Sequence, residues 1–217
     1  MEKLAIIGSG ISGMGAAYYL RNQYEIEIFE KKNYVGGHTN TVTVEDGGRP
    51  LPVDTGFIVF NHVNYPNLTR LFHELDVPYH NSNMSFSMHN LDTGLQFNGR
   101  GLNGLFAQRL NVFKPSYWKF LVQANRFNNL APEHLENGEA EVPFLEYLEE
   151  QGYDENFIYN YILPMGSAVW STPIDKMVEF PASSFIRFFK NHGFLGLNTQ
   201  HQWKTVTGGS HVYMRRI

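Results

Sequence analysis

Residues 4–20 read LAIIGSGISGMGAAYYL, an apolar run that meets three glycines and continues as a stretch of small residues. This order predicts a strand, a tight turn and a helix, because glycine allows turns and close approaches that other residues do not. Gly8 permits the turn, Gly10 leaves room for a pyrophosphate, and Gly13 lets the helix pack closely on the strand. The helix amino terminus then directs free N–H groups and its positive dipole end at the phosphates.

A second apolar run supplies the context that a glycine turn alone lacks. Residues 24–29 follow the predicted helix. The next residue is Glu30, twenty residues after Gly10. Dinucleotide-binding folds place there the carboxylate that accepts hydrogen bonds from the adenosine ribose hydroxyls. A solvated charge at a strand end would explain Glu30, but not the order strand, turn, helix, strand and acid. The sequence therefore predicts a dinucleotide-binding βαβ unit over residues 3–30.

Composition sets the limits of the interpretation. The chain has 217 residues, of which 42% are hydrophobic and 15% aromatic, so it can bury a core as one large domain or two small ones. The net charge of −4, without a dense Lys and Arg cluster, argues against nucleic acid as a partner. The absence of cysteine excludes disulfides, thiolate chemistry and Cys-bound metals. Because no run has the length of a membrane span and no secretory signal begins the chain, we expect a cytoplasmic protein.

Turn residues and hydrophobic spacing divide the rest of the chain. The expected elements are a glycine-bearing loop at 33–40, a strand at 41–45 with a turn at 46–48, an extended segment at 51–61, a helix at 66–75, short strands near 83–89 and 94–98, helices at 103–110, 115–130, 142–151, 154–170 and 181–192, and a strand, glycine turn and helix start at 202–210. We predict a nucleotide-binding core of residues 1–62 rejoined by 202–217, and a substrate or cap region of residues 63–201 that is mostly helical after 103.

A pair of adjacent glycines bears on which dinucleotide binds. Gly36 and Gly37 begin six residues after Glu30. Adjacent glycines expose backbone N–H groups at close range, which suits a second approach to the pyrophosphate. The alternative is an ordinary loop turn, but the pairing with Glu30 favours the binding role.

Several motifs together resemble a known superfamily. IIGSGISGMGAA at 6–17, Glu30 followed by GGHT at 36–39, and VDTG at 53–56 resemble the FAD-binding half of the flavin amine oxidase and phytoene desaturase superfamily. DTGFIVFN at 54–61 and MGSAVWSTP at 165–173 are similar to a bacterial group of predicted FAD-dependent, amine-oxidase-like proteins associated with cyclopropane fatty acyl phospholipid synthases. The resemblance implies an α/β fold: a Rossmann-like FAD-binding core of the glutathione-reductase type with a mainly helical substrate or cap region. It also implies an amino-terminal fragment, incomplete at its carboxyl-terminal end.

The resemblance also implies a set of FAD-binding residues. Those expected at the pyrophosphate are Gly8, Gly10, Ile11, Ser12 and Gly13; those at the adenosine are Glu30 and Lys31; those at the pyrophosphate and ribityl chain are Gly36, Gly37, His38 and Thr39; and those beside the isoalloxazine ring are Gly56, Phe57 and Ile58. Members of the superfamily commonly have Arg at the position of His38. A neutral imidazole binds phosphate less strongly than a guanidinium, so we expect weaker or pH-dependent cofactor affinity.

The implied activity is that of an FAD-dependent oxidoreductase that moves a hydride from an amine or an acyl or lipid-like substrate to flavin N5. No catalytic residue is assigned, because the superfamily's Lys near N5 belongs to the later half of such proteins. No metal is expected: His73 and Glu74 begin like a zinc motif, but Val77 stands where the second His is needed. Two alternatives stay open: an NAD-dependent dehydrogenase, against which the glycine pair argues, and a non-catalytic lipid carrier like the Rab GDP-dissociation inhibitors.

The aromatic residues of 153–203 have three interpretations. The first is the core of the helical region, the second a lining for a long apolar substrate channel. The third is a membrane-surface helix at 184–197, where Arg187 and Lys190 interrupt an apolar face. The expected partner is thus a small-molecule or lipid substrate, with peripheral contact to the inner membrane face left open. The sequence does not determine the oligomeric state.

Overall fold

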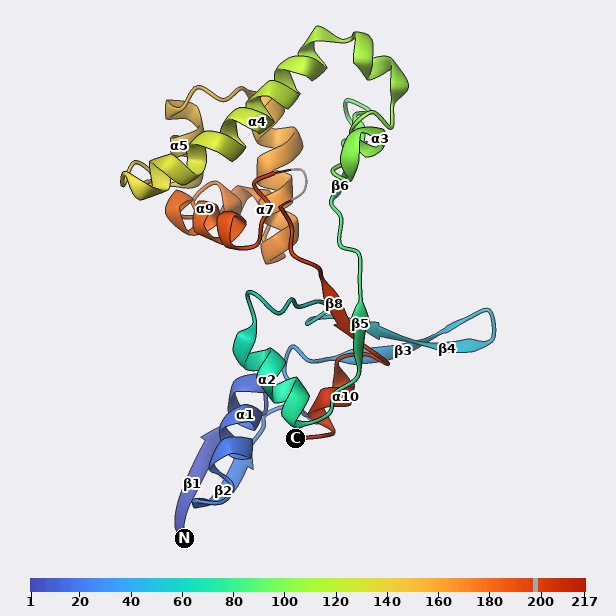
Figure 1. Cartoon of the computed structure of the whole chain (residues 1–217), viewed down its shortest axis with the longest axis vertical. Helices are drawn as coiled ribbons and strands as arrows, with labels where there is room; N and C mark the ends of the chain where they lie inside the picture. The colour runs from blue at the N-terminus through green and yellow to red at the C-terminus, as the bar shows by residue number, and fades with distance from the viewer. Residues whose placement is uncertain (197–198) are drawn as a thin grey trace. The chain divides into compact units, whose positions relative to one another are not determined.

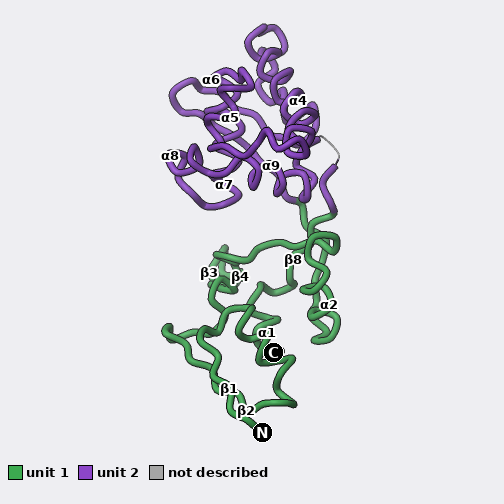
Figure 2. The backbone as a smooth tube through the Cα atoms, turned by 90° about the vertical axis from the view of Figure 1, so that its left-hand side faces the viewer, with its two compact units in different colours: residues 1–83, 202–217 green, residues 84–201 purple. Residues whose placement is uncertain are grey.

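The computed structural model of the chain describes residues 1–196 and 199–217. The backbone forms two compact units, residues 1–83 with 202–217, and residues 84–201 (Figure 1; Figure 2). Residues 63–83, which the sequence assigned to the substrate region, lie in the first of these units. The division of labour between the two regions stays a proposal.

The first unit begins with the predicted βαβ element. The strands β1 (Glu2–Ile7) and β2 (Tyr24–Phe29) flank the helix α1 (Ile11–Leu20). They pair in parallel, with Leu4 beside Ile26 and Ile6 beside Ile28. Because parallel neighbours need a crossover, α1 lies against the two strands, as Figure 1 shows. The predicted Rossmann-like element is therefore confirmed.

The remainder of the first unit joins segments from the two ends of the chain. A hairpin of β3 (Thr41–Asp46) and β4 (Arg49–Asp54) turns at Gly47 and Gly48, whose φ angles are +57° and +79°. The helix α2 (Pro66–Glu74) and strand β5 (Tyr79–Asn81) follow. The returning segment supplies β8 (Lys204–Val206), antiparallel to β5, and the short helix α10 (His211–Met214).

The hydrophobic core of the first unit is built from both of these segments. Phe60, Phe72 and Val77 pack against residues that follow 201 in sequence, namely Val206, Tyr213 and Met214. The Phe60 and Phe72 rings lie 5.1 Å apart, edge to face, and the Phe72 and Tyr213 rings 5.0 Å apart. The unit therefore depends on its returning segment, residues 202–217, for half of its core.

The second unit is mainly helical. Its elements are β6 (Ser87–His89) and β7 (Gln96–Asn98), which pair antiparallel, then α3 (Gly101–Leu105), the 3-10 helix η1 (Arg109–Phe113), α4 (Pro115–Glu136), α5 (Phe144–Glu150), α6 (Glu155–Phe157), the π-helix η2 (Ile158–Ile162), α7 (Leu163–Trp170), α8 (Ile174–Met177) and α9 (Ala182–Asn191). In the part of the chain that the structure describes, no helix combines the length and apolarity that crossing a membrane requires.

Stacked aromatic rings form the core of the second unit. The Phe185 ring lies 4.0 Å from the rings of both Phe144 and Phe189. A Cβ at Gly166 would lie 2.7 Å from the Phe185 ring, so glycine allows α7 to approach α9. The buried face of α9 agrees with the core interpretation of this helix, while Arg187 is exposed. Leu197, where the predicted membrane-surface segment ends, lies outside the described residues.

Two predicted helices of the second unit differ from the structure. Instead of one helix over 103–110, α3 ends at Leu105 and η1 begins at Arg109. Gln108 between them is extended because its side chain accepts from the Gln96 N–H at 3.1 Å and donates to the Gly94 carbonyl at 2.7 Å. The helix predicted over 154–170 contains the π turn of η2 just before Pro164, which has no N–H for a regular helical bond.

Candidate dinucleotide-binding site

The glycine turn after β1 has three different local geometries. Gly8 has a φ of +95°, and its N–H donates to the Phe29 carbonyl at 2.7 Å, which ties the turn to β2. A Cβ at Gly13 would lie 2.0 Å from the Gly8 carbonyl oxygen, so only glycine fits where α1 meets the turn. A Cβ at Gly10 would meet nothing within 4 Å. The side of the Gly10 backbone on which a side chain would stand is therefore accessible to a ligand.

The start of α1 faces the same open space. Gly10 is the N-cap of this helix and provides no side-chain cap. The first-turn N–H groups of an α-helix have no acceptor within the helix, and they carry its positive dipole end. Ile11 and Ser12, which supply two of these groups, are exposed. The helix start can therefore receive an anion through its backbone.

The second glycine pair lies directly against this turn. Gly36 forms a parallel bridge with Gly10, and its N–H donates to the Ser9 carbonyl at 3.0 Å. Gly37 has a φ of +61°, and a Cβ there would lie 3.2 Å from the Cα of Gly10. The structure therefore brings together the two glycine segments on which the sequence prediction depends.

Glu30 follows β2 and points back to the glycine turn. Its Oε2 accepts hydrogen bonds from the N–H of Ser9 at 2.9 Å and from its Oγ at 2.5 Å, while Oε1 accepts the Lys32 N–H at 2.9 Å. These hydrogen bonds, first that of the Lys32 N–H and then those of Ser9, lower the pKa of the Glu30 carboxyl from 4.5 to about 2. Glu30 is therefore ionised at neutral pH and keeps lone pairs for further donors. Lys31 beside it is exposed.

Ser9 is a residue of this site that the sequence analysis missed. It is 1% exposed and holds Glu30 with both its backbone and its hydroxyl. The glycine pattern treats this position as variable, so only its small polar side chain between two glycines could have indicated a role.

The segment after the glycine pair connects to the returning end of the chain. Thr39 is buried, and its hydroxyl is hydrogen bonded to that of Tyr213. His38 is exposed, and its carbonyl accepts the Phe57 N–H at 2.9 Å. A Cβ at Gly56 would lie 2.2 Å from this same carbonyl oxygen, so the backbone at Gly56 is in direct contact with the backbone at His38.

The last two predicted residues differ in their surroundings. Phe57 packs edge to face on Tyr213, with 6.1 Å between ring centroids, so its ring belongs to the core boundary. Ile58 is 55% exposed. All predicted binding residues thus lie in the first unit, from the βαβ element to the segment after β4.

Asp54 at the end of β4 is a structural carboxylate. Its Oδ1 accepts from the Ser210 N–H at 2.8 Å, from the Ser210 hydroxyl at 2.7 Å and from the Thr41 hydroxyl at 2.5 Å. These contacts fix the start of α10 to the β3–β4 hairpin. With its carboxylate occupied by these contacts, Asp54 has a structural role.

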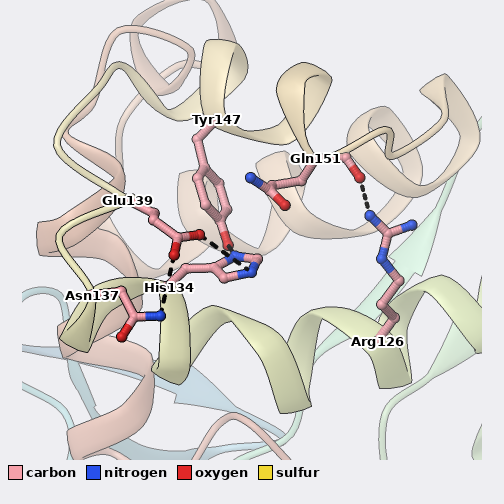
Figure 3. Close-up of polar contacts among 6 residues, drawn as sticks. All are labelled: Arg126, His134, Asn137, Glu139, Tyr147 and Gln151. Carbon is pink, nitrogen blue, oxygen red and sulfur yellow. Dashed lines mark hydrogen bonds and ion pairs between the residues drawn. The ribbon is translucent and has the colours of Figure 1, made fainter.

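The second unit contains a separate polar cluster, shown in Figure 3. The Tyr147 hydroxyl is hydrogen bonded to His134 Nδ1 at 2.8 Å, and His134 Nε2 lies 3.8 Å from a carboxylate oxygen of Glu139. Tyr147 is fully buried, and burial raises the pKa of its hydroxyl above the usual range. A tyrosine that keeps its proton so firmly suits a fixed hydrogen bond between α4 and α5, not a nucleophile. Among the described residues, no group of three or more His, Asp or Glu side chains could hold a metal ion.

Comparisons with known proteins agree with this geometry. Residues 6–75 match the family described as NAD(P)-binding Rossmann-like domain. The chain is 40% identical over 73 residues to protoporphyrinogen oxidase of Dictyostelium discoideum, covering 24% of this chain and 14% of that protein. It is 32% identical over 80 residues to 1-hydroxycarotenoid 3,4-desaturase of Flavobacterium sp. strain P99-3, covering 36% and 16%. It is 48% identical over 48 residues to prenylcysteine oxidase 1 of Bos taurus, covering 20% and 9%.

Solved structures share the fold along the chain. Cyclohexylamine oxidase from Brevibacterium oxydans IH-35A superimposes with a TM-score of 0.68 at 17% identity, and a redesigned putrescine oxidase with 0.65 at 20%. Each alignment covers 99% of this chain and 48% of the other, so the chain spans about half the length of these structures. The chain thus has a Rossmann-like, dinucleotide-binding fold, is locally similar in sequence to protoporphyrinogen oxidase and a carotenoid desaturase, and shares its fold with amine oxidases.

Proposed function

We propose that the first unit binds FAD and that the whole protein is an FAD-dependent oxidoreductase. The observation that carries this proposal is the meeting of two glycine segments at the start of α1, with Gly36 bridged to Gly10 and open space above Gly10. A pyrophosphate needs backbone N–H groups at close range on more than one side, and this arrangement supplies them.

The residues in this region fit the successive parts of the cofactor. Gly8, Gly10 and Gly13 shape the turn, and Ile11 and Ser12 offer N–H groups to the pyrophosphate. Glu30, held ionised by Ser9 and Lys32, accepts ribose hydroxyls, with Lys31 beside the adenosine. The residues nearer the ring system are Gly36, Gly37, His38, Thr39, Gly56, Phe57 and Ile58. Of these, Ile58 is open to a neighbouring ring, because more than half of its surface is exposed.

Bound FAD would supply the ability to accept a hydride from an activated C–H bond. The chain itself would supply binding, orientation and exclusion of water. For the substrate we propose a lipid-like molecule in preference to a small amine. The preference is supported by relatives whose names specify a hydroxycarotenoid and a prenylcysteine, whereas the amine oxidases are alike in fold alone.

The runner-up is a nicotinamide dinucleotide in place of FAD. A simple nicotinamide site needs the turn, the helix and the acid, but it has no use for a second glycine pair pressed on the first. The contact of Gly37 with Gly10 therefore favours FAD. A non-catalytic lipid carrier of the same architecture is less well supported, because the open backbone at Gly10 suits a bound phosphate.

A flavin titration tests the proposal. We expect the desalted chain to quench FAD fluorescence on binding, and NADH to compete poorly. Gly10→Ala would place a methyl group in the open space and abolish FAD binding while leaving the fold intact. Gly15→Ala in the same helix is the matched control, because a Cβ there also meets nothing within 4 Å.

The outcomes separate the candidates. FAD binding lost in Gly10→Ala and kept in Gly15→Ala supports the site. Tight binding of NADH without FAD would establish the runner-up. Equal FAD affinity in both variants would place the cofactor elsewhere and refute the proposed site.

A further inference from the structure

One stretch of the second unit carries a charge opposite to that of the whole chain. Residues 93–132 hold five of the chain's 17 Lys and Arg residues and none of its 21 Asp and Glu residues. Their net charge is therefore +5, whereas that of the chain is −4. Lys119 pairs with Asp154 at 2.9 Å, but over residues 1–196 and 199–217 neither Arg109 nor Lys114 forms an ion pair.

The same stretch exposes large apolar side chains around η1. We define the η1 surface as Leu110, Val112, Phe113, Trp118 and Val122, with the cations Arg109 and Lys114. Phe113 is 81% exposed, Leu110 73% and Val122 64%. Side chains three residues apart eclipse each other on a 3-10 helix, so Leu110 and Phe113 lie on one side of η1.

Contacts join η1 to the start of α4 as one surface. The Trp118 ring donates its N–H to the Val112 carbonyl at 2.8 Å, so the indole lies beside η1. Val122 is four residues further along α4 and therefore on the same helix face as Trp118. Lys114 is the residue between η1 and α4. In Figure 1 the amino-terminal part of α4 extends beyond α5, α7 and α9, and η1 lies at that end.

The helix α9, by contrast, buries most of its large apolar side chains, and only Phe188 among them is partly exposed. Phe185, Ile186 and Phe189 are 0–1% exposed and pack inside the second unit. A membrane contact through 184–197, which the sequence left open, therefore has no support in the described part of that segment. The apolar and cationic groups that such a contact needs are instead gathered at η1.

We propose that the η1 surface binds an anionic lipid membrane. Exposed Leu and Phe side chains bury themselves at the boundary of head groups and acyl chains, and Trp settles at the interface. Arg109 and Lys114 meet the lipid phosphates, and the surrounding forty residues of sequence contain no Asp or Glu that would repel those phosphates. A protein interface is less well matched, because its buried centre is depleted of charge, whereas here two cations flank the apolar tips. This inference does not depend on the cofactor.

Vesicle sedimentation of the 217-residue chain tests the proposal. We expect binding to phosphatidylcholine vesicles that contain about one third phosphatidylglycerol, weaker binding as salt rises, and little binding to pure phosphatidylcholine. Each basic residue near such a surface contributes about fivefold in affinity, so Arg109→Gln with Lys114→Gln should weaken binding about 25-fold. Lys176→Gln with Arg187→Gln is the matched control, since it removes two exposed cations from the same unit.

A second pair of variants tests the apolar contribution. Leu110→Ser with Phe113→Ser should lower the bound fraction by at least about tenfold, because two inserted side chains are lost. The control is Leu91→Ser, at a residue of the same unit that is 84% exposed. Because these side chains are exposed, circular dichroism should show an unchanged fold for all variants.

Three results would overturn the proposal. The first is no binding of the parent chain to anionic vesicles, and the second is equal loss in the variants and their controls. The third is a dimer in light scattering that Leu110→Ser with Phe113→Ser dissociates, in a chain that does not sediment with vesicles. That result would assign the η1 surface to a second copy of the chain.

Discussion

Replacing Gly13 by alanine gives a direct test of how α1 packs on the glycine turn. A Cβ at Gly13 would lie 2.0 Å from the Gly8 carbonyl oxygen, and real Cβ atoms come no closer than 3.0 Å, so a shift of 1.0 Å is needed. Because the obstructing atom belongs to the backbone, the cost falls at the upper end for overpacking, about 3 kcal/mol. The gain in helix propensity from Gly to Ala returns about 1 kcal/mol. The net destabilisation of the βαβ element is then about 2 kcal/mol.

Native-state hydrogen exchange of the amides in β1, α1 and β2 measures this local free energy. Gly13→Ala should speed their exchange about 30-fold, since about 1.4 kcal/mol corresponds to a factor of ten. In Gly15→Ala the added Cβ contacts nothing, so the only effect on stability is the higher helix propensity of alanine. This variant should therefore slow amide exchange about fivefold. If the two variants exchanged at the same rate, the close approach of α1 to Gly8 would not limit this position, and the steric argument would fail.

Three further predictions concern polar contacts in the two units. The lowered pKa of Glu30 contributes stability that is present above about pH 4.5 and lost as the pH falls toward 2, so Ser9→Ala, which removes one donor, should raise that pKa and reduce the acid dependence. A carboxyl NMR titration measures the pKa, and an unchanged value would show that the hydroxyl is not a donor. Asp54→Asn should cost about 2 kcal/mol in urea unfolding and speed proteolysis near residues 202–217, because the charged acceptor of three hydrogen bonds is lost; parent-like proteolysis would contradict this. Tyr147→Phe should cost about 1–2 kcal/mol, and a double-mutant cycle with His134→Leu should reveal coupling; strictly additive effects would mean that the hydrogen bond contributes nothing.

The features that the sequence predicted well are those set by neighbouring residues. The βαβ element follows from two apolar runs, three glycines and an acid within thirty residues, and each of these acts locally. The strand β5 was not predicted, because it has three residues and exists through pairing with β8, in which Tyr79 lies beside Val206. The break at Gln108 likewise depends on contacts with Gly94 and Gln96 that no hydrophobic period reveals.

The candidate site divides in the same way. The glycines, Glu30 and the pair at Gly36 could be identified by type and spacing, and the cofactor role assigned to them stays a prediction. Ser9 could not be identified, because the glycine pattern does not constrain the residue at this position. The hydrogen bond between Thr39 and Tyr213 could not be identified either. It joins residues that are 174 positions apart, and sequence spacing carries no signal over such a distance.

The first unit is assembled from both ends of the chain, and this has a consequence for its folding during synthesis. The first unit receives Val206, Tyr213 and Met214 only after the ribosome has translated the whole of residues 84–201. At about 5–20 residues per second, that interval lasts roughly 6–24 s. Throughout this interval Phe60 and Phe72 lack half of their packing partners, while the second unit is being synthesised as one continuous segment. The unit that the ribosome begins first is therefore the one that is completed last.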